Sequence, residues 1–178
     1  MKKIYTMVSI LLILVVLFFY IIPSKKDFEV KDVKGVLCLI IDDFGHSNNQ
    51  LVSDFLFMPP DFTIAVIPGL SYSTYLSNYS DSLGFENIVH MPMEAFNQDM
   101  YNDHPYLLSS SLNEIEVENK ISNAFIEVPK AIGMNNHQGS KATENLQLMK
   151  YVARSLKKKD KYFLDSFTNP ESRGFITM

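Results

Sequence analysis

The chain has 178 residues, a net charge of −4 and a hydrophobic content of 47%. This acidic balance argues against a nucleic-acid-binding protein, because such a protein needs a basic surface to neutralise phosphates. The one cysteine, Cys38, cannot form an internal disulfide. Its position inside the apolar run 35–41 predicts a small buried residue.

The N-terminus carries an uncharged apolar run, MVSILLILVVLFFYII, at residues 7–22, with lysines on both sides. A transmembrane helix needs about 17–25 such residues, so the run is near the short limit. A cleaved signal peptide would require a small-residue cleavage site after this run, and none is present. We therefore expect an uncleaved membrane anchor over residues 1–26, with a cleaved signal peptide as the alternative. A polar linker over 27–34 would lead to a domain outside the cytoplasm, at the periplasmic face of the inner membrane in a Gram-negative cell.

From residue 35 onward, short β-rich runs alternate with helical patterns. The predicted strands are residues 35–41, 62–67, 86–91, 131–135 and 161–165. The apolar spacing predicts helices over residues 47–57, 72–83, 111–127 and 143–159, the third opening with a capping box at Ser111 and Glu114. This alternation predicts an α/β domain of parallel β/α units. Residues 94–110 are expected to form a long loop at the rim of a site.

Acidic and imidazole side chains recur where the predicted strands end. They are Asp42 and Asp43 after the first strand, His90 and Glu94 after the third, His137 after the fourth and Asp165 after the fifth. In a parallel sheet these ends meet at one edge. Two imidazoles and a carboxylate are a common ligand set for a catalytic zinc ion, and a second carboxylate can act as a base.

Each of these residues also has a plain structural interpretation when it is considered alone. The two aspartates could cap the next helix, and His90 could be a hydrogen-bonded core residue. His137 could lie in an ordinary loop, and Asp165 in a turn. His46 and His104 are interpreted as solvated residues. The recurrence of acids and histidines at strand ends is what favours a site.

At these positions the sequence resembles the divergent polysaccharide deacetylase family. The matching stretches are LIIDDFG (39–45), FTIAVIPG with YS (62–73), IVHMPME (88–94), AIGMNNHQGS with T (131–143) and YFLDSFTNP (162–170). The resemblance implies a distorted (β/α) barrel like that of carbohydrate deacetylases. Because further strands would be needed to close such a barrel, residues 35–178 are expected to be an incomplete, C-terminally truncated member.

The resemblance also implies roles for individual residues. Asp42 corresponds to the catalytic base and Asp43 to a metal ligand. Ordinary members take two more ligands from an H-x-x-x-H motif, which here reads His90-Met-Pro-Met-Glu94. His137 is therefore expected to be the second imidazole.

Further residues of the matching stretches are expected to support this site. Glu94, Asn136 and Ser140 are candidates for a supporting shell or a further ligand. Asp165 is expected to be a second catalytic residue that orients a ligand or the acid.

The resulting hypothesis is a zinc-type, divalent-metal-dependent deacetylase that acts on an acetylated glycan of the cell envelope. The alternative is a non-catalytic domain that binds an envelope glycan or protein on the same scaffold. The loop aromatics Phe96, Tyr101 and Tyr106 either stack on sugar rings or pack inside the protein. A phosphoesterase ranks lower, since Lys141 is the one obvious cation for a phosphate. The sequence predicts no oligomeric state.

Overall fold

The computed structural model describes residues 34–97 and 101–178. The predicted anchor over residues 1–26 and nearly all of the predicted linker lie outside the described residues. Among the described helices, none combines the length and the apolar character that crossing a bilayer requires. Residues 38–178 form one compact unit, and the fold below is that of this unit.

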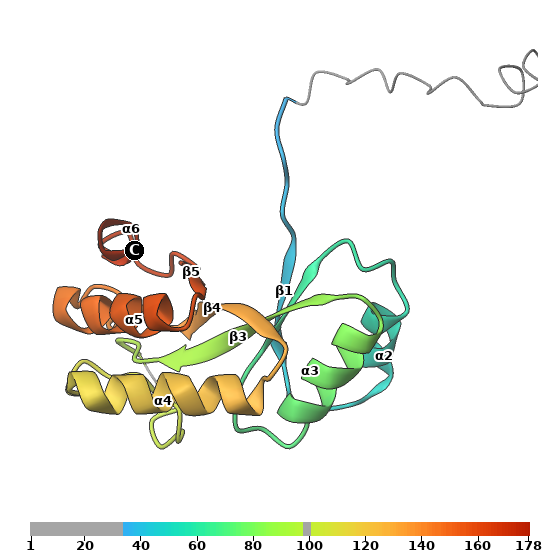
Figure 1. Cartoon of the computed structure of the whole chain (residues 1–178), viewed down its shortest axis with the longest axis horizontal. Helices are drawn as coiled ribbons and strands as arrows, with labels where there is room; N and C mark the ends of the chain where they lie inside the picture. The colour runs from blue at the N-terminus through green and yellow to red at the C-terminus, as the bar shows by residue number, and fades with distance from the viewer. Residues whose placement is uncertain (1–33, 98–100) are drawn as a thin grey trace, which may run out of the picture. The chain divides into compact units, whose positions relative to one another are not determined.

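The unit is built on one sheet of five parallel strands (Figure 1). The strands are β1 (Ile40–Phe44), β2 (Thr63–Val66), β3 (Glu86–Met93), β4 (Ala131–Gln138) and β5 (Tyr162–Leu164). Each strand pairs with the next one in the chain, so the order in the sheet is the order in the sequence. This confirms the predicted parallel β/α units, and sequential strand order is the order of a (β/α) barrel.

Helices follow the strands, and the apolar spacing predicted all of them except the short C-terminal one. They are α2 (Gln50–Leu56), α3 (Ser73–Ser82), α4 (Glu114–Glu127), α5 (Leu146–Lys158) and the short α6 (Gly174–Thr177). Asparagines at positions 49, 113 and 145 cap three of them by accepting a backbone hydrogen bond in the first turn. Lys157 and Lys158 close α5, where positive charge complements the helix dipole.

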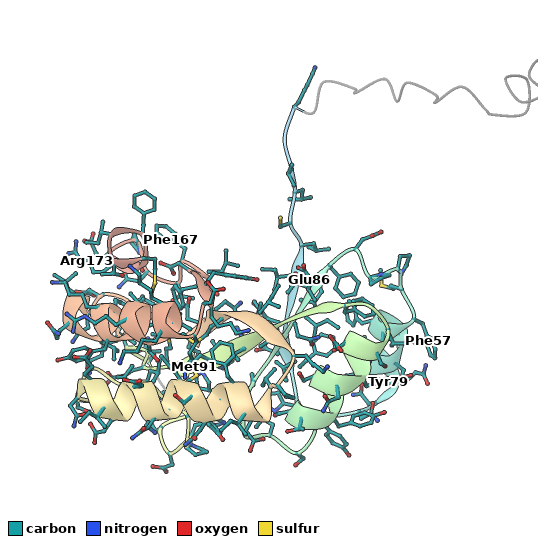
Figure 2. The ribbon with its side chains drawn as sticks, in the orientation of Figure 1. Phe57, Tyr79, Glu86, Met91, Phe167 and Arg173 are labelled. Atoms are coloured by element: carbon teal, nitrogen blue, oxygen red, sulfur yellow. The ribbon has the colours of Figure 1, made fainter. Side chains whose placement is uncertain are left out.

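The core lies between the sheet and its helices. In α4, Val117, Ile121 and Ala124 follow helical spacing and are fully buried. Helices α4 and α5 contact each other and run side by side (Figure 1). Met91 of β3, labelled in Figure 2, is fully buried in this core. This packing holds the carboxyl ends of the strands in fixed positions.

Two sequence predictions at the start of elements were wrong. The first strand begins at Ile40, not at residue 35, because pairing with β2 starts there. Cys38 is consequently exposed and is not a core residue. The capping box of α4 uses Asn113 and Glu116 rather than Ser111 and Glu114, because the asparagine side chain accepts the backbone N–H of Glu116, two residues later than predicted.

Candidate metal centre

Three donor atoms from three strands form a tight triangle. Oδ1 of Asp43 lies 3.1 Å from Nε2 of His90 and 3.0 Å from Nδ1 of His137. The two imidazole nitrogens are 3.2 Å apart. Across the described part of the chain, these residues form the group of acidic and imidazole side chains that could hold a metal ion. The three ligands named from the sequence are therefore together in the structure.

At the end of β1 the side chains of the two adjacent aspartates, Asp42 and Asp43, point to different partners. The pairing of β1 with β2 shifts register between Ile41 and Phe44, as at a β-bulge. Asp43 has φ of 67°, a left-handed conformation that aspartate tolerates better than most residues. Such a distortion re-aims side chains, and here Asp43 faces the two histidines. Asp42 instead reaches Asn135 of β4.

The pairing of β3 with β4 brings the two histidines to one face. His90 is in register with Asn135, and His137 lies two residues beyond Asn135 on the same strand. Residues two apart on a strand share a face. All three side chains therefore point the same way, and the imidazole rings of His90 and His137 meet edge to face at 4.9 Å.

Asn135 orients His90 and connects it to Asp42. The Nδ1 atom of His90 is 2.7 Å from Oδ1 of Asn135 and donates to it, since an amide oxygen can only accept. The amide nitrogen of Asn135 donates to Oδ1 of Asp42 at 2.9 Å. With its proton on Nδ1, His90 directs the lone pair of Nε2 toward the position on which Asp43 and His137 also converge. A metal-binding histidine is usually oriented in this way by its second nitrogen.

Charge and spacing at the triangle fit a divalent ion such as zinc. The imidazole of His137, which can donate to Asp43 from Nδ1, and the adjacent imidazole of His90 hold the pKa of Asp43 far below its usual value, against the opposing effect of burial, so this ligand is ionised at neutral pH. Ligands about 2.0–2.1 Å from a tetrahedral zinc ion lie about 3.3 Å from one another. The observed separations of 3.0–3.2 Å are close to this value. The residues present therefore fit the ion.

A cavity of about 220 Å³ opens beside the centre. Both Asp42 and Asp43 line it, and its other walls come from the end of β1 and from α2, including Leu51 and Phe55. Small-molecule pockets usually have about 300–1,000 Å³. This cavity can therefore take one group or one ring of a larger substrate beside the two carboxylates.

Glu94 points away from the triangle. Its carboxylate accepts hydrogen bonds from the backbone and hydroxyl of Ser110 and pairs with Lys141 at 2.8 Å. Although burial acts in the opposite direction, these partners lower the pKa of Glu94. Glu94 thus joins the loop after β3 to the loop after β4. Lys141, the cation considered for a phosphate, is engaged in this pair.

Three other predicted site residues make contacts within the loops. Asn136 is buried and bonds to the backbone of Gln138 and Ser166. The hydroxyl of Ser140 accepts the backbone N–H of Phe96. Asp165 accepts hydrogen bonds from the backbone of Phe167 and the hydroxyl of Ser172 in its own loop. Its predicted catalytic role remains a prediction.

Of the three aromatic residues considered in the loop after β3, two pack inside the protein and one is exposed. Tyr101 is 6% exposed and lies against His137, while Tyr106 packs against the core. Phe96 is 62% exposed, so its predicted role in stacking on a sugar stays a prediction. His104 is half-buried next to Tyr101, unlike the solvated residue expected, because the loop folds back over the centre.

The sequence predicted neither the support of His90 by Asn135 nor the contact between Tyr101 and His137. The two-residue spacing to His137 could have identified Asn135, because it predicts a shared strand face. Nothing in the sequence indicates that Tyr101 meets His137, since α4 and most of β4 lie between the two residues in the chain.

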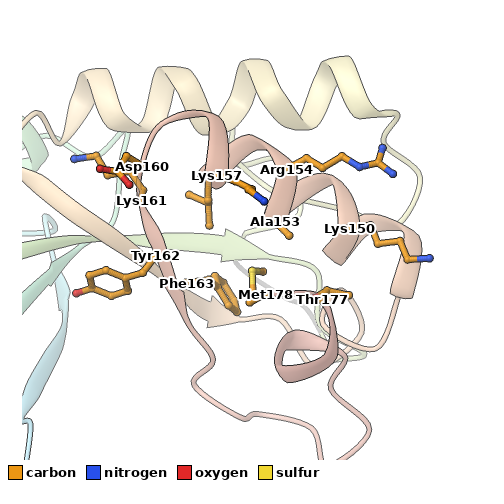
Figure 3. Close-up of a pocket in the computed structure, with 11 residues that line it drawn as sticks. Lys150, Ala153, Arg154, Lys157, Asp160, Lys161, Tyr162, Phe163, Thr177 and Met178 are labelled. Atoms are coloured by element: carbon orange, nitrogen blue, oxygen red, sulfur yellow. The ribbon is translucent and has the colours of Figure 1, made fainter.

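A second cavity, of about 530 Å³, lies between α5, β5 and α6 (Figure 3). Its rim carries Lys150, Arg154, Lys157 and Lys161, and Phe163 and Met178 are among its apolar residues. None of the residues predicted for the site lines it. Cavity size alone therefore does not identify the place where this protein concentrates its acids and histidines.

Comparisons with known proteins agree with this geometry. A family model described as divergent polysaccharide deacetylase matches residues 39–176. The uncharacterized protein YibQ of Escherichia coli K12 is 34% identical over 137 residues, which cover 75% of this chain and 41% of YibQ. An uncharacterized protein of Haemophilus influenzae Rd is 34% identical over 132 residues, covering 74% of this chain and 46% of that protein.

The chain thus spans less than half the length of these relatives. Among solved structures, the uncharacterized protein ATU2773 of Agrobacterium tumefaciens C58 shares the fold, with a TM-score of 0.67 at 18% identity. The match covers 76% of this chain and 55% of that one. Because the family model spans most of the chain, and the predicted ligands meet at the strand ends, the chain belongs to the divergent polysaccharide deacetylase family.

Proposed function

We propose that this protein is a metal-dependent deacetylase that removes acetyl groups from a glycan of the cell envelope. The observation that supports this most directly is the triangle of Asp43, His90 and His137, which lies beside a second carboxylate, that of Asp42. A divalent ion held by these three residues, zinc in our proposal, would polarise the acetyl carbonyl and make water more acidic. Family membership supports the same reaction class.

In the proposed reaction the chain's own residues move one proton and position the acetyl group. Asp42 accepts a proton from the water that attacks the carbonyl carbon. Its hydrogen bond from Asn135 keeps the carboxylate oriented. Collapse of the tetrahedral species breaks the bond to the sugar nitrogen or oxygen, which takes up the proton as acetate leaves. The adjoining cavity receives part of the substrate.

The location of the enzyme is part of the proposal. The apolar residues 7–22 support a membrane anchor, and an acetylated envelope glycan is accessible to a domain held outside the cytoplasm. Protease protection in intact spheroplasts tests this, because an outward domain is digested without lysis. Protection of the domain until the membrane is broken would contradict the location.

His137→Ala tests the metal centre. Elemental mass spectrometry on the full chain is expected to find about one divalent ion per wild-type molecule and none in the variant. Circular dichroism should show unchanged secondary structure, since His137 lies at the carboxyl end of β4 and is not part of the hydrophobic core. Equal metal content in both proteins would contradict the ligand assignment.

A non-catalytic binding domain is the second candidate. It is favoured by the position of Asp165, whose carboxylate is engaged within its own loop. Acetate release from acetylated envelope glycans separates the two functions. Glycan binding by the metal-free protein, with no acetate released by the metal-loaded protein, would favour the binding domain.

A further inference from the structure

The two histidines of the centre are held in different ways. His90 is 3% exposed and is oriented by the hydrogen bond from its Nδ1 to Asn135. His137 uses Nδ1 toward Asp43, which leaves Nε2 as its second ring nitrogen. Within residues 34–97 and 101–178, that buried Nε2 has no hydrogen-bond partner. Among the described residues, no hydrogen bond at this second nitrogen orients the ring of His137 as Asn135 orients His90, so packing is left for that task.

Tyr101 supplies that packing. Its ring centroid lies 4.4 Å from that of His137, with an angle of 59° between the planes. The contact is closer than the 4.9 Å between the two imidazoles themselves. The ring of His104 also lies against the tyrosine, with centroids 5.3 Å apart, and Tyr101 is buried. Aromatic pairs in such arrangements stabilise one another beyond the effect of burial alone, which favours the observed position of the His137 ring.

The hydroxyl of Tyr101 contacts the loop that follows the carboxylate ligand in the chain. It lies 2.9 Å from Nε2 of His46, which is three residues beyond Asp43. The loop between β1 and α2 is anchored in turn by Gly45, whose carbonyl accepts the backbone N–H of Tyr72. One side chain thus contacts a ligand from β4 and the segment that follows a ligand from β1.

We propose that Tyr101 is the positioning residue of the metal centre, holding the His137 imidazole by ring packing and fixing its own ring through His46. This inference rests on the metal site of the proposed function. Asn135 performs the same task for His90 by hydrogen bonding. The loss of a group that orients a metal ligand typically lowers metal affinity about 10–100-fold.

Competition titrations with a zinc chelator on the full chain in detergent test this. Tyr101→Ala is expected to weaken zinc binding about 10–100-fold. Tyr101→Phe keeps the ring and is expected to lose less than about tenfold. Tyr106→Ala removes a tyrosine of the same loop that packs on the core, and should leave zinc affinity unchanged. With cobalt in place of zinc, the visible spectrum should change in Tyr101→Ala and not in Tyr106→Ala.

The outcomes separate this inference from the proposed function. A wild-type chain that binds no ion would overturn both. A wild-type chain that binds zinc, with unchanged affinity in Tyr101→Ala, would overturn the role of Tyr101 alone. If Tyr101→Ala lacks a cooperative unfolding transition, Tyr101→Leu fills the volume without an aromatic ring. Wild-type affinity in that variant would equally overturn the inference.

Discussion

Replacing Asn135 by alanine tests the connection between His90 and Asp42. The change removes the acceptor of the His90 Nδ1–H and the donor to Asp42. Because His90 is buried, its N–H is left without a partner, which costs about 1–3 kcal/mol. Asp42 is 42% exposed in its side chain, so water replaces the lost donor there and adds little to this cost. For a chain of this size, about 1–3 kcal/mol lowers Tm by about 2–12 °C.

The assay has two parts, and both use metal-depleted wild-type protein as the reference. Urea unfolding of Asn135→Ala should show the loss of stability, while Asn119→Ala, an exposed change on α4, should not. Zinc titration should then show affinity reduced by about 10–100-fold, because Nε2 of His90 is no longer aimed at the site. An Asn135→Ala variant with wild-type unfolding midpoint and wild-type affinity would refute the reasoning.

Two further predictions concern the carboxylates around the centre. Asp42→Asn is expected to keep its metal and to lose acetate release by about 100-fold or more, the usual contribution of a general base. Equal turnover in steady-state kinetics would remove Asp42 from the mechanism. Glu94→Gln is expected to lower the free energy of unfolding by about 1–2 kcal/mol through its partners Lys141 and Ser110. Since the folded pKa of Glu94 is below 4.5, its contribution is complete well above that pH and is lost as the pH falls through the folded pKa. Urea unfolding of both proteins at a series of pH values measures this, and a stability difference that grows on acidification would contradict it.

The position of Glu94 also explains how the centre differs from a motif with two histidines four residues apart. In this chain the second imidazole comes from the neighbouring strand, at His137. The glutamate is then available to join two loops instead of binding metal. The loop that it holds carries Tyr101 against His137. Glu94 therefore acts on the centre through the loop and not through contact with the donor atoms.

The sequence by itself was sufficient for the order of strands and helices and for three donors at strand ends. Apolar spacing distinguishes strand from helix, and the carboxyl ends of parallel strands meet at one edge whatever the details of packing. Asp43, His90 and His137 could therefore be grouped with the other strand-end candidates, and the family resemblance then selected these three as ligands. The start of β1, and with it the exposure of Cys38, depended on where a neighbouring strand begins to pair.

The tertiary structure decided which face of each strand points to the centre, and with it which neighbouring residues lie there. A shift of one residue along a strand moves a side chain to the other face, which is why Asn135 and not Asn136 supports His90. The register shift in β1 separates Asp42 from Asp43 in the same way. Tyr101 reaches His137 through a long loop, whose path depends on packing and ion pairs between residues distant in sequence. Local patterns in a sequence do not encode such contacts.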